Sequence, residues 1–122
     1  MKLLLVSIVL YCLVGCSDKD RGTSGILDKE KMETVMWDFI KADVFTENFI
    51  KKDSLKNPAV ENMQLQNKIF SHHNISKEDF YKSYDYYMAH NDVMKIILDS
   101  LSSRGERERS KMVHQRAGIQ PK

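Results

Sequence analysis

Cysteine is scarce in this chain of 122 residues, and both copies, Cys12 and Cys16, lie near the N-terminus. Cys12 lies inside an apolar stretch that we expect to be removed during export, which would leave Cys16 as the first and only cysteine of the mature chain. A single cysteine excludes an intramolecular disulfide, although an exported compartment would permit one. An unpaired cysteine at this position is most consistent with an acyl acceptor.

Long hydrophobic runs are also lacking. The longest, residues 3–14, follows the single charge of Lys2 and has about a dozen residues, whereas roughly 20 are needed to span a bilayer. The run ends in Leu13-Val14-Gly15-Cys16, which resembles the lipobox where signal peptidase II cleaves before a diacylglycerated cysteine. We therefore predict that residues 1–15 are a lipoprotein signal peptide and that lipid on Cys16 anchors the protein to a membrane. The alternative is an ordinary secretory signal with Cys16 as a thiol.

Residues 16–25 are polar and contain glycine and serine, so we expect a flexible tether. Ser17-Asp18-Lys19-Asp20 resembles the acidic signals that send lipoproteins of the Bacteroidota to the cell surface, but a solvated linker explains it equally well. The expected location is the outer membrane, with the periplasmic and surface faces both open.

Positive charge is concentrated at the C-terminus. Residues 17–103 carry 12 Lys and Arg against 15 Asp and Glu, whereas residues 104–122 carry six against two. This distribution excludes a nucleic-acid surface that covers the whole protein, and we expect no nucleic-acid partner. Residues 104–122 also lack an apolar face, which predicts a basic tail that is flexible or ordered by a partner. Gly105 is expected to end the last helix, with a helix that continues as an exposed arm as the alternative.

The intervening residues, 26–103, predict an all-α domain, a small bundle of about four short helices. Capping residues and apolar periodicity place the helices at about 29–52, 58–72, 77–90 and 92–103. The second helix has the narrowest apolar face and is expected to be peripheral. The expected N-caps are Asp28, Asn57 before Pro58, Ser76, and Asn91 or Asp92.

The first helix is apolar on two sides. Its main face is expected to enter the core and consists of Met32, Val35, Met36, Phe39, Thr46, Phe49 and Ile50. Trp37, Ile40 and Val44 form a second strip, which we expect to be buried beneath the last helix, with a partner-binding surface as the alternative. Tyr86 points away from the other aromatic side chains of the third helix and is a further candidate for that partner surface.

Asp38 and Asp43 interrupt the apolar pattern of the first helix, but their five-residue spacing puts them on different faces. We expect each to be paired structurally with a Lys, a Tyr or a backbone N–H, because a buried carboxylate needs a partner. His72 and His73 diverge by about 100° on a helix and have no further ligand at zinc-site spacing. We predict no metal site and no cofactor there, and a helix C-terminus with a left-handed Asn74 instead.

Several short patterns together resemble those of short helical lipoproteins of the Bacteroidota that are grouped as a domain of unknown function. The resemblance spans about residues 26–101 and rests on Leu27, Glu30-Lys31-Met32, Asp38, Ile69-Phe70, Ile75-Ser76-Lys77-Glu78-Asp79-Phe80, Ser83, Tyr86-Tyr87 and Ile96-Ile97. It implies a small helical lipoprotein and brings no activity, cofactor or catalytic residue.

No arrangement of Ser/His/Asp, Cys/His, metal ligands or a phosphate-binding loop with recognisable spacing occurs in the sequence, so we predict that the protein is not an enzyme. The expected role is a lipid-anchored, non-catalytic interaction or accessory module of the cell envelope with a protein partner. The alternatives are a periplasmic, chaperone-like binder of extended peptides and a hydrolase.

Replacing Cys16 tests the lipidation prediction. A Cys16→Ser protein should lose firm membrane attachment, because two or three acyl chains are needed to hold a protein on a bilayer. Metabolic labelling with an alkyne fatty acid should mark the wild-type chain alone. Label that persists in the Cys16→Ser protein would contradict the prediction.

Overall fold

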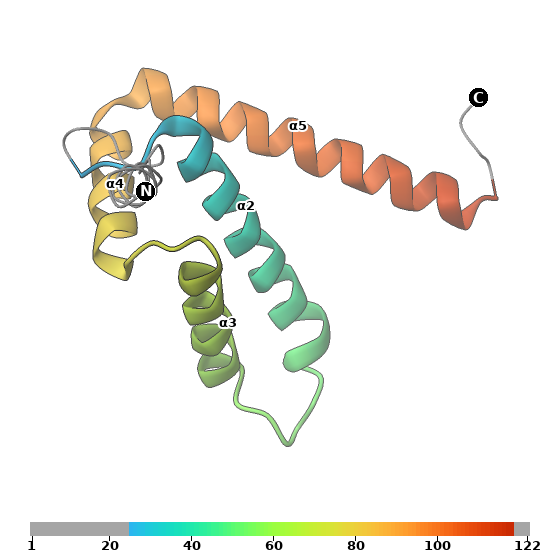
Figure 1. The fold of residues 1–122 in the computed structure, drawn as a ribbon. Helices are drawn as coiled ribbons and strands as arrows, with labels where there is room; N and C mark the ends of the chain where they lie inside the picture. Colours follow the sequence, from blue (N-terminus) through green and yellow to red (C-terminus); the bar gives the residue numbers. More distant parts are fainter. Residues whose placement is uncertain (1–24, 119–122) are drawn as a thin grey trace, which may run out of the picture.

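The computed structural model describes residues 25–118, and this range is built from helices (Figure 1). The elements are α2 (Lys29–Phe45), a π-helical turn η1 that continues it (Thr46–Ile50), α3 (Pro58–His72), α4 (Lys77–Ala89) and α5 (Asn91–Arg116). The predicted all-α class with four helices is confirmed. The lipobox, Cys16 and the tether up to residue 24 lie outside the described residues.

Three of the four predicted N-caps are confirmed. Asp28 accepts a hydrogen bond from the Lys31 amide at 2.7 Å, and Ser76 accepts one from the Asp79 amide at 2.9 Å. Asn57 accepts from two amides of the first turn of α3. These caps satisfy backbone N–H groups that have no partner inside the helix. α2, α3 and α4 therefore begin at the residues that the sequence predicts.

The start of α5 differs from the prediction. Its N-cap is His90, which is also the C-cap of α4, and Asn91 and Asp92 lie inside the helix. A single residue therefore connects the two helices, and its side chain makes no capping hydrogen bond to α5. The short connection fixes α5 at the end of α4 without the polar cap that the sequence suggested.

The second helix ends as predicted. α3 stops at His72, His73 is its C-cap, and Asn74 takes the left-handed conformation with φ of 52°. Among the α3 residues only Phe70 is fully buried, which agrees with the predicted peripheral position.

α2 is the central helix and packs against α3, α4 and α5. Aromatic rings from three elements meet at its inner face, where the ring centroids of Phe39 and Phe80 are 4.9 Å apart and those of Phe70 and Phe80 are 5.7 Å apart. The buried core contains Leu27, Met32, Val35, Trp37, Phe70, Ile75, Phe80, Tyr87, Met94, Ile97 and Leu101. Within it, burial of large apolar side chains supplies most of the stabilisation that a domain of this size can gather.

Two buried hydrogen bonds at Leu27, called the Leu27 clip below, hold the segment before α2 on α4. The Leu27 amide donates to Ser83 Oγ at 2.8 Å, and the Tyr87 hydroxyl donates to the Leu27 carbonyl at 2.8 Å. Burial raises the pKa of Tyr87, and the Asp28 carboxylate adds to the shift, so this hydroxyl keeps its proton and remains a donor. The described chain therefore begins beside α4.

The predicted end of the last helix at Ser103 is wrong, and the alternative of a helix that continues is correct, because α5 extends to Arg116. Gly105 costs about 1 kcal/mol relative to alanine inside a helix, but it ends one only when it adopts a left-handed cap. Here it stays helical, and the Trp37 ring lies 3.9 Å from the position that a Cβ would occupy. The C-terminal half of α5 then extends past the other helices as an arm (Figure 1).

Two truncations test how much of α5 belongs to the domain. A chain that ends after Ser103 loses the two residues that cover Trp37, and its free energy of unfolding should fall by about 1–2 kcal/mol. A chain that ends after Arg109 keeps this cover and should be within about 0.5 kcal/mol of the full chain. Thermal unfolding followed by circular dichroism distinguishes the two, and equal stability of both truncated chains would contradict the packing described here.

Candidate functional site

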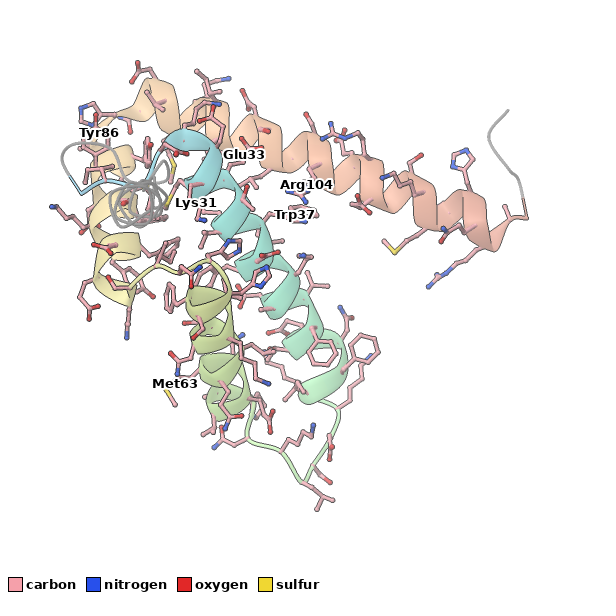
Figure 2. The ribbon with its side chains drawn as sticks, in the orientation of Figure 1. Lys31, Glu33, Trp37, Met63, Tyr86 and Arg104 are labelled. Carbon is pink, nitrogen blue, oxygen red and sulfur yellow. The ribbon has the colours of Figure 1, made fainter. Side chains whose placement is uncertain are left out.

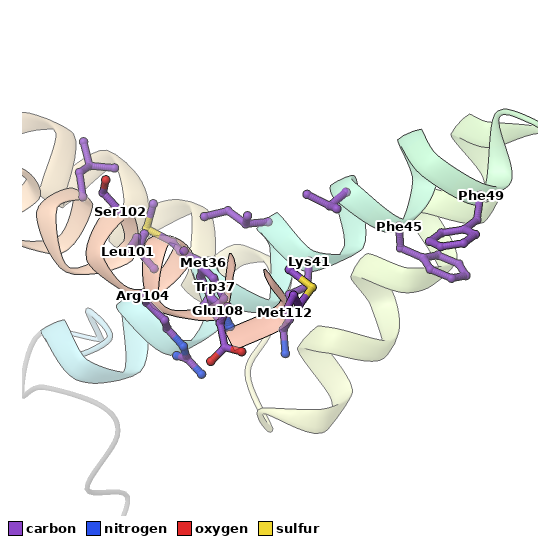
Figure 3. Close-up of a pocket in the computed structure, with 14 residues that line it drawn as sticks. Met36, Trp37, Lys41, Phe45, Phe49, Leu101, Ser102, Arg104, Glu108 and Met112 are labelled. Carbon is purple, nitrogen blue, oxygen red and sulfur yellow. The ribbon is translucent and has the colours of Figure 1, made fainter. Parts of the chain in front are cut away.

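α2 and α5 cross near Trp37 and then diverge, leaving an open groove between them (Figure 3). The groove has a volume of about 870 Å³. Its α2–η1 wall includes Met36, Trp37, Ile40, Lys41, Val44, Phe45 and Phe49, and its α5 wall includes Leu98, Leu101, Ser102, Arg104, Gly105, Glu108 and Met112. Apolar side chains dominate the α2–η1 wall, whereas the α5 wall combines Leu98, Leu101 and Met112 with polar and charged residues. The groove therefore suits a ligand surface that is mainly apolar.

Trp37 lies at the closed end of the groove and is only 9% exposed. Gly105 lets the α5 backbone lie close to the indole, and the Arg104 guanidinium stacks over the ring at 4.8 Å from its centroid (Figure 2). The predicted burial of Trp37 beneath the last helix is confirmed. The residues that bury it belong to the segment that the sequence assigned to a flexible tail.

The rest of the second apolar strip is not covered, and its predicted burial is wrong. Ile40 is 40% exposed and Val44 is 53% exposed, because α5 has moved away from α2 by the time it passes them. Phe49 was expected in the core, yet it is exposed and its ring stacks on that of Phe45 at a centroid distance of 5.3 Å. Ile40, Val44 and this aromatic pair are therefore in contact with solvent.

The charged residues at the groove differ in how they are paired. Lys41 Nζ lies 2.6 Å from Asp38 Oδ1, and Glu108 Oε1 lies 3.3 Å from Lys111 Nζ. Arg104, by contrast, has no carboxylate within ion-pair distance among residues 25–118. A half-buried guanidinium without a counter-charge thus lies above the indole, at an apolar surface.

Tyr86 lies apart from this groove. It is on α4, on the far side of the molecule from Arg104, and its ring stacks on that of His90 at 4.1 Å (Figure 2). Its side chain is exposed, as the sequence predicted. The structure therefore does not bring the four candidate partner-surface residues together, and Tyr86 belongs to a different surface from Trp37, Ile40 and Val44.

A second polar cluster links α2 to the end of α3. His73 Nε2 lies 2.7 Å from Asp38 Oδ2, and Lys41 binds the other carboxylate oxygen. Burial opposes ionisation of Asp38, but the hydrogen bonds from Lys41 and His73 outweigh it and lower the pKa of this carboxyl below its ordinary value. Asp38 is therefore a paired, ionised group that fixes α3 against the middle of α2.

The predicted structural pairing is confirmed for Asp38, which binds Lys41. For Asp43 the predicted kinds of partner are wrong, because the residue is exposed and accepts from a side-chain amide. Asn62 Nδ2 donates to Asp43 Oδ1 at 2.9 Å and also to Thr46 Oγ1 at 3.1 Å. Both carboxylates thus connect α2 to α3.

An imidazole beside a carboxylate also occurs in hydrolases, where the ring activates a hydroxyl or thiol. Among residues 25–118, no serine, threonine or cysteine side chain hydrogen-bonds to His73. In the same part of the chain, no group of three or more His, Cys, Asp and Glu side chains is placed to hold a metal ion. The arrangement as it stands is an ion-paired link between α2 and the end of α3.

Sequence reasoning missed much of the α5 wall, above all Arg104 and Met112. A signal was present, because Leu101, Gly105, Glu108 and Met112 recur at helical spacing and continue the inner face of the last helix past Ser103. The charged residues in this segment concealed that continuity.

A family model described as a domain of unknown function (DUF4296) matches residues 24–111, so the chain belongs to that family. The matched range includes α2 to α4 and the part of α5 that passes over Trp37. No curated protein and no solved structure matched the chain. None of the described helices is both long enough and apolar enough to cross a bilayer.

The pairing of Asp38 predicts how the free energy of unfolding depends on pH. The pKa of Asp38 is lower in the folded protein than in the unfolded chain, where it is about 4. The ionised carboxylate therefore stabilises the fold above the unfolded value, and this stabilisation is lost as the pH falls through the pKa of the folded protein. Asp38→Asn should cost about 1–2 kcal/mol at pH 7, and this difference should shrink toward zero at acid pH. Urea unfolding at several pH values measures both quantities.

Asp43→Asn provides the matched control, because this carboxylate is on the same helix but is exposed and has an amide as its partner. It should change the free energy of unfolding by less than about 0.5 kcal/mol. Equal losses in the two variants, or a loss at Asp38 that does not depend on pH, would contradict the pairing.

Proposed function

We propose that this protein is a lipid-anchored, non-catalytic interaction module of the cell envelope, and that it binds a partner protein in the groove between α2 and α5. One observation carries the proposal. The exposed side chains of Ile40, Val44, Phe45 and Phe49 line a concave surface that faces solvent. Exposed apolar patches of this kind mark interaction sites in soluble domains.

The composition of the groove also fits binding of a protein. Tryptophan and arginine are enriched among residues that dominate interface energies, and Trp37 with Arg104 forms the closed end. Packing by Gly105 and the core holds the indole in place before a partner arrives, so binding does not bear the cost of ordering it.

The lipobox supports the membrane part of the proposal. Leu13-Val14-Gly15-Cys16 would place the lipid a short distance before the first described residues, which lie beside α4. The Leu27 clip holds that end of the domain. The lining of the groove extends to Phe49 on η1 and to Met112 on α5. In Figure 1 these two segments lie away from α4, so an anchored domain would present the groove away from the attachment point. The outer membrane is the proposed location.

Met36 and Met112 give a chaperone-like peptide binder some support as a second candidate. Both line the groove, and flexible, polarizable methionine side chains adapt to ligands of different shape. A module with one stable partner and a binder of many peptides differ in how many proteins the groove contacts in the envelope.

A pair of substitutions with matched exposure tests the proposal. Val44 is 53% exposed inside the groove, and Ile96 is 55% exposed on α5 outside it. Val44→Glu should reduce recovery of the cross-linked partner by about tenfold, because it puts a carboxylate into an apolar contact, whereas Ile96→Glu should leave recovery unchanged. Both should preserve the melting temperature within a few degrees.

The measurement is chemical cross-linking of the anchored protein in intact envelopes, followed by purification and quantification of the joined proteins. Equal recovery from the two variants would mean that the groove is not the binding surface. Many unrelated proteins joined through Val44-dependent contacts would favour the peptide binder.

A further inference from the structure

We propose that the occupant of the groove is an acidic amphipathic helix of three to four turns, supplied by another protein, whose carboxylate pairs with Arg104. This inference rests on the proposed function and specifies the chemistry of its partner. It depends on the length of the groove walls, their composition and the unpaired charge at the closed end.

The walls of the groove have the dimensions of a helix-binding site. On α2 and η1 the lining runs from Trp37 to Phe49, about 18 Å at the helical rise of 1.5 Å per residue, and on α5 it runs from Leu98 to Met112, about 21 Å. A helix of about 12–14 residues matches that length. Two diverging helices also present the ridges between which a third helix packs.

The apolar residues are spaced to receive an apolar stripe. Ile40, Val44 and Phe45 follow Trp37 at intervals of three, four and one residues along α2, and Leu98, Leu101 and Met112 lie opposite on α5. Amphipathic helices bind such grooves through side chains at positions i, i+3, i+4 and i+7. An extended peptide would leave its own backbone polar groups unpaired, because this site offers helices and no sheet edge among the described residues.

Charge selects an acidic helix over a basic one. Arg104 is half-buried at the closed end, and within residues 25–118 its partner is the Trp37 ring and no carboxylate. A carboxylate beside the incoming apolar stripe therefore gains a charge-assisted hydrogen bond there. The rest of the arm is basic as well, since residues 104–116 carry five Lys and Arg against two Asp and Glu. Of the three charged residues that line the groove itself, Lys41 and Arg104 are positive and Glu108 is negative, so a basic helix would meet repulsion at Arg104.

The same charge argues against a second copy of this chain. The exposed helical segment that another copy could insert is its own α5 arm, which carries that excess of positive charge. An anionic lipid surface would satisfy the charge but is flat at this scale, and it cannot contact both walls of a concave groove. The acidic helix satisfies the shape and the charge together.

Site-specific photo-cross-linking in the full, anchored chain tests the inference. A benzoylphenylalanine probe replaces Phe45 inside the groove, and a control probe replaces Tyr86, which is equally exposed on α4. After irradiation of the envelopes, mass spectrometry identifies the peptide joined to each probe. The expected result is a probe-45 product in a net-acidic segment with apolar residues at helical spacing, and little of it from position 86.

Substitutions on α5 test the charge separately. Arg104→Glu should lower the yield of the probe-45 product by about tenfold, whereas Arg107→Glu, which changes a cation outside the groove lining, should lower it by less than about twofold. Because Arg104 also covers Trp37, Arg104→Met is added. It keeps an apolar stem over the ring, should melt close to wild type, and should still lose about tenfold.

Every outcome bears on one of the two proposals. Equal products from the two probes would overturn the proposed function itself. Probe 45 could instead give a specific product with a second copy of this chain, with a lipid, or with a basic or non-helical segment. That result would support the groove as a binding site and would contradict the proposal that an acidic helix occupies it. Equal yields from the Arg104 and Arg107 variants would overturn the role of Arg104.

Discussion

The structure depends on how the other helices cover α2, which has apolar side chains around most of its circumference. α3, α4 and the first half of α5 all pack on α2 and bury one side of it. On the other side they bury Trp37. Three short helices cannot enclose a fourth along its full length. Because α5 leaves α2 after Gly105, the second apolar side remains open from Ile40 to Phe49, and this incomplete cover creates the groove.

Trp37 determines where the covered part ends. The α5 backbone at Gly105 packs beside the indole, and Arg104 covers the face of the ring. This packing draws the start of the basic segment into the domain and leaves the rest of α5 as an exposed helical arm. A mainly acidic body and a basic arm thus meet at one groove, and the proposed partner must satisfy both its apolar walls and its positive rim.

The sequence predicted what local interactions decide. The caps at Asp28, Asn57 and Ser76 act within one turn of their helices, so the starts of α2, α3 and α4 were correct. The preferred end of α5 was wrong, because local patterns do not show that Gly105 packs beside an indole 68 residues earlier in the chain. Likewise, Asp38 was expected to be paired, but helical periodicity could not identify His73 on another helix. Helical periodicity identified the second apolar strip of the first helix but not the angle at which α5 crosses it. The predicted burial was therefore correct for Trp37 and wrong for Ile40 and Val44.

Amide hydrogen exchange along α5 in the isolated full chain tests this account most directly. Residues that pack on α2, up to about Gly105, should be protected close to the level of global unfolding, and protection should fall steeply beyond Glu106, where the helix has no tertiary support. Rapid exchange from Ser103 onward would mean that α5 does not cover Trp37. Uniform protection as far as Arg116 would mean that another surface already covers the arm, and either result would contradict the open groove.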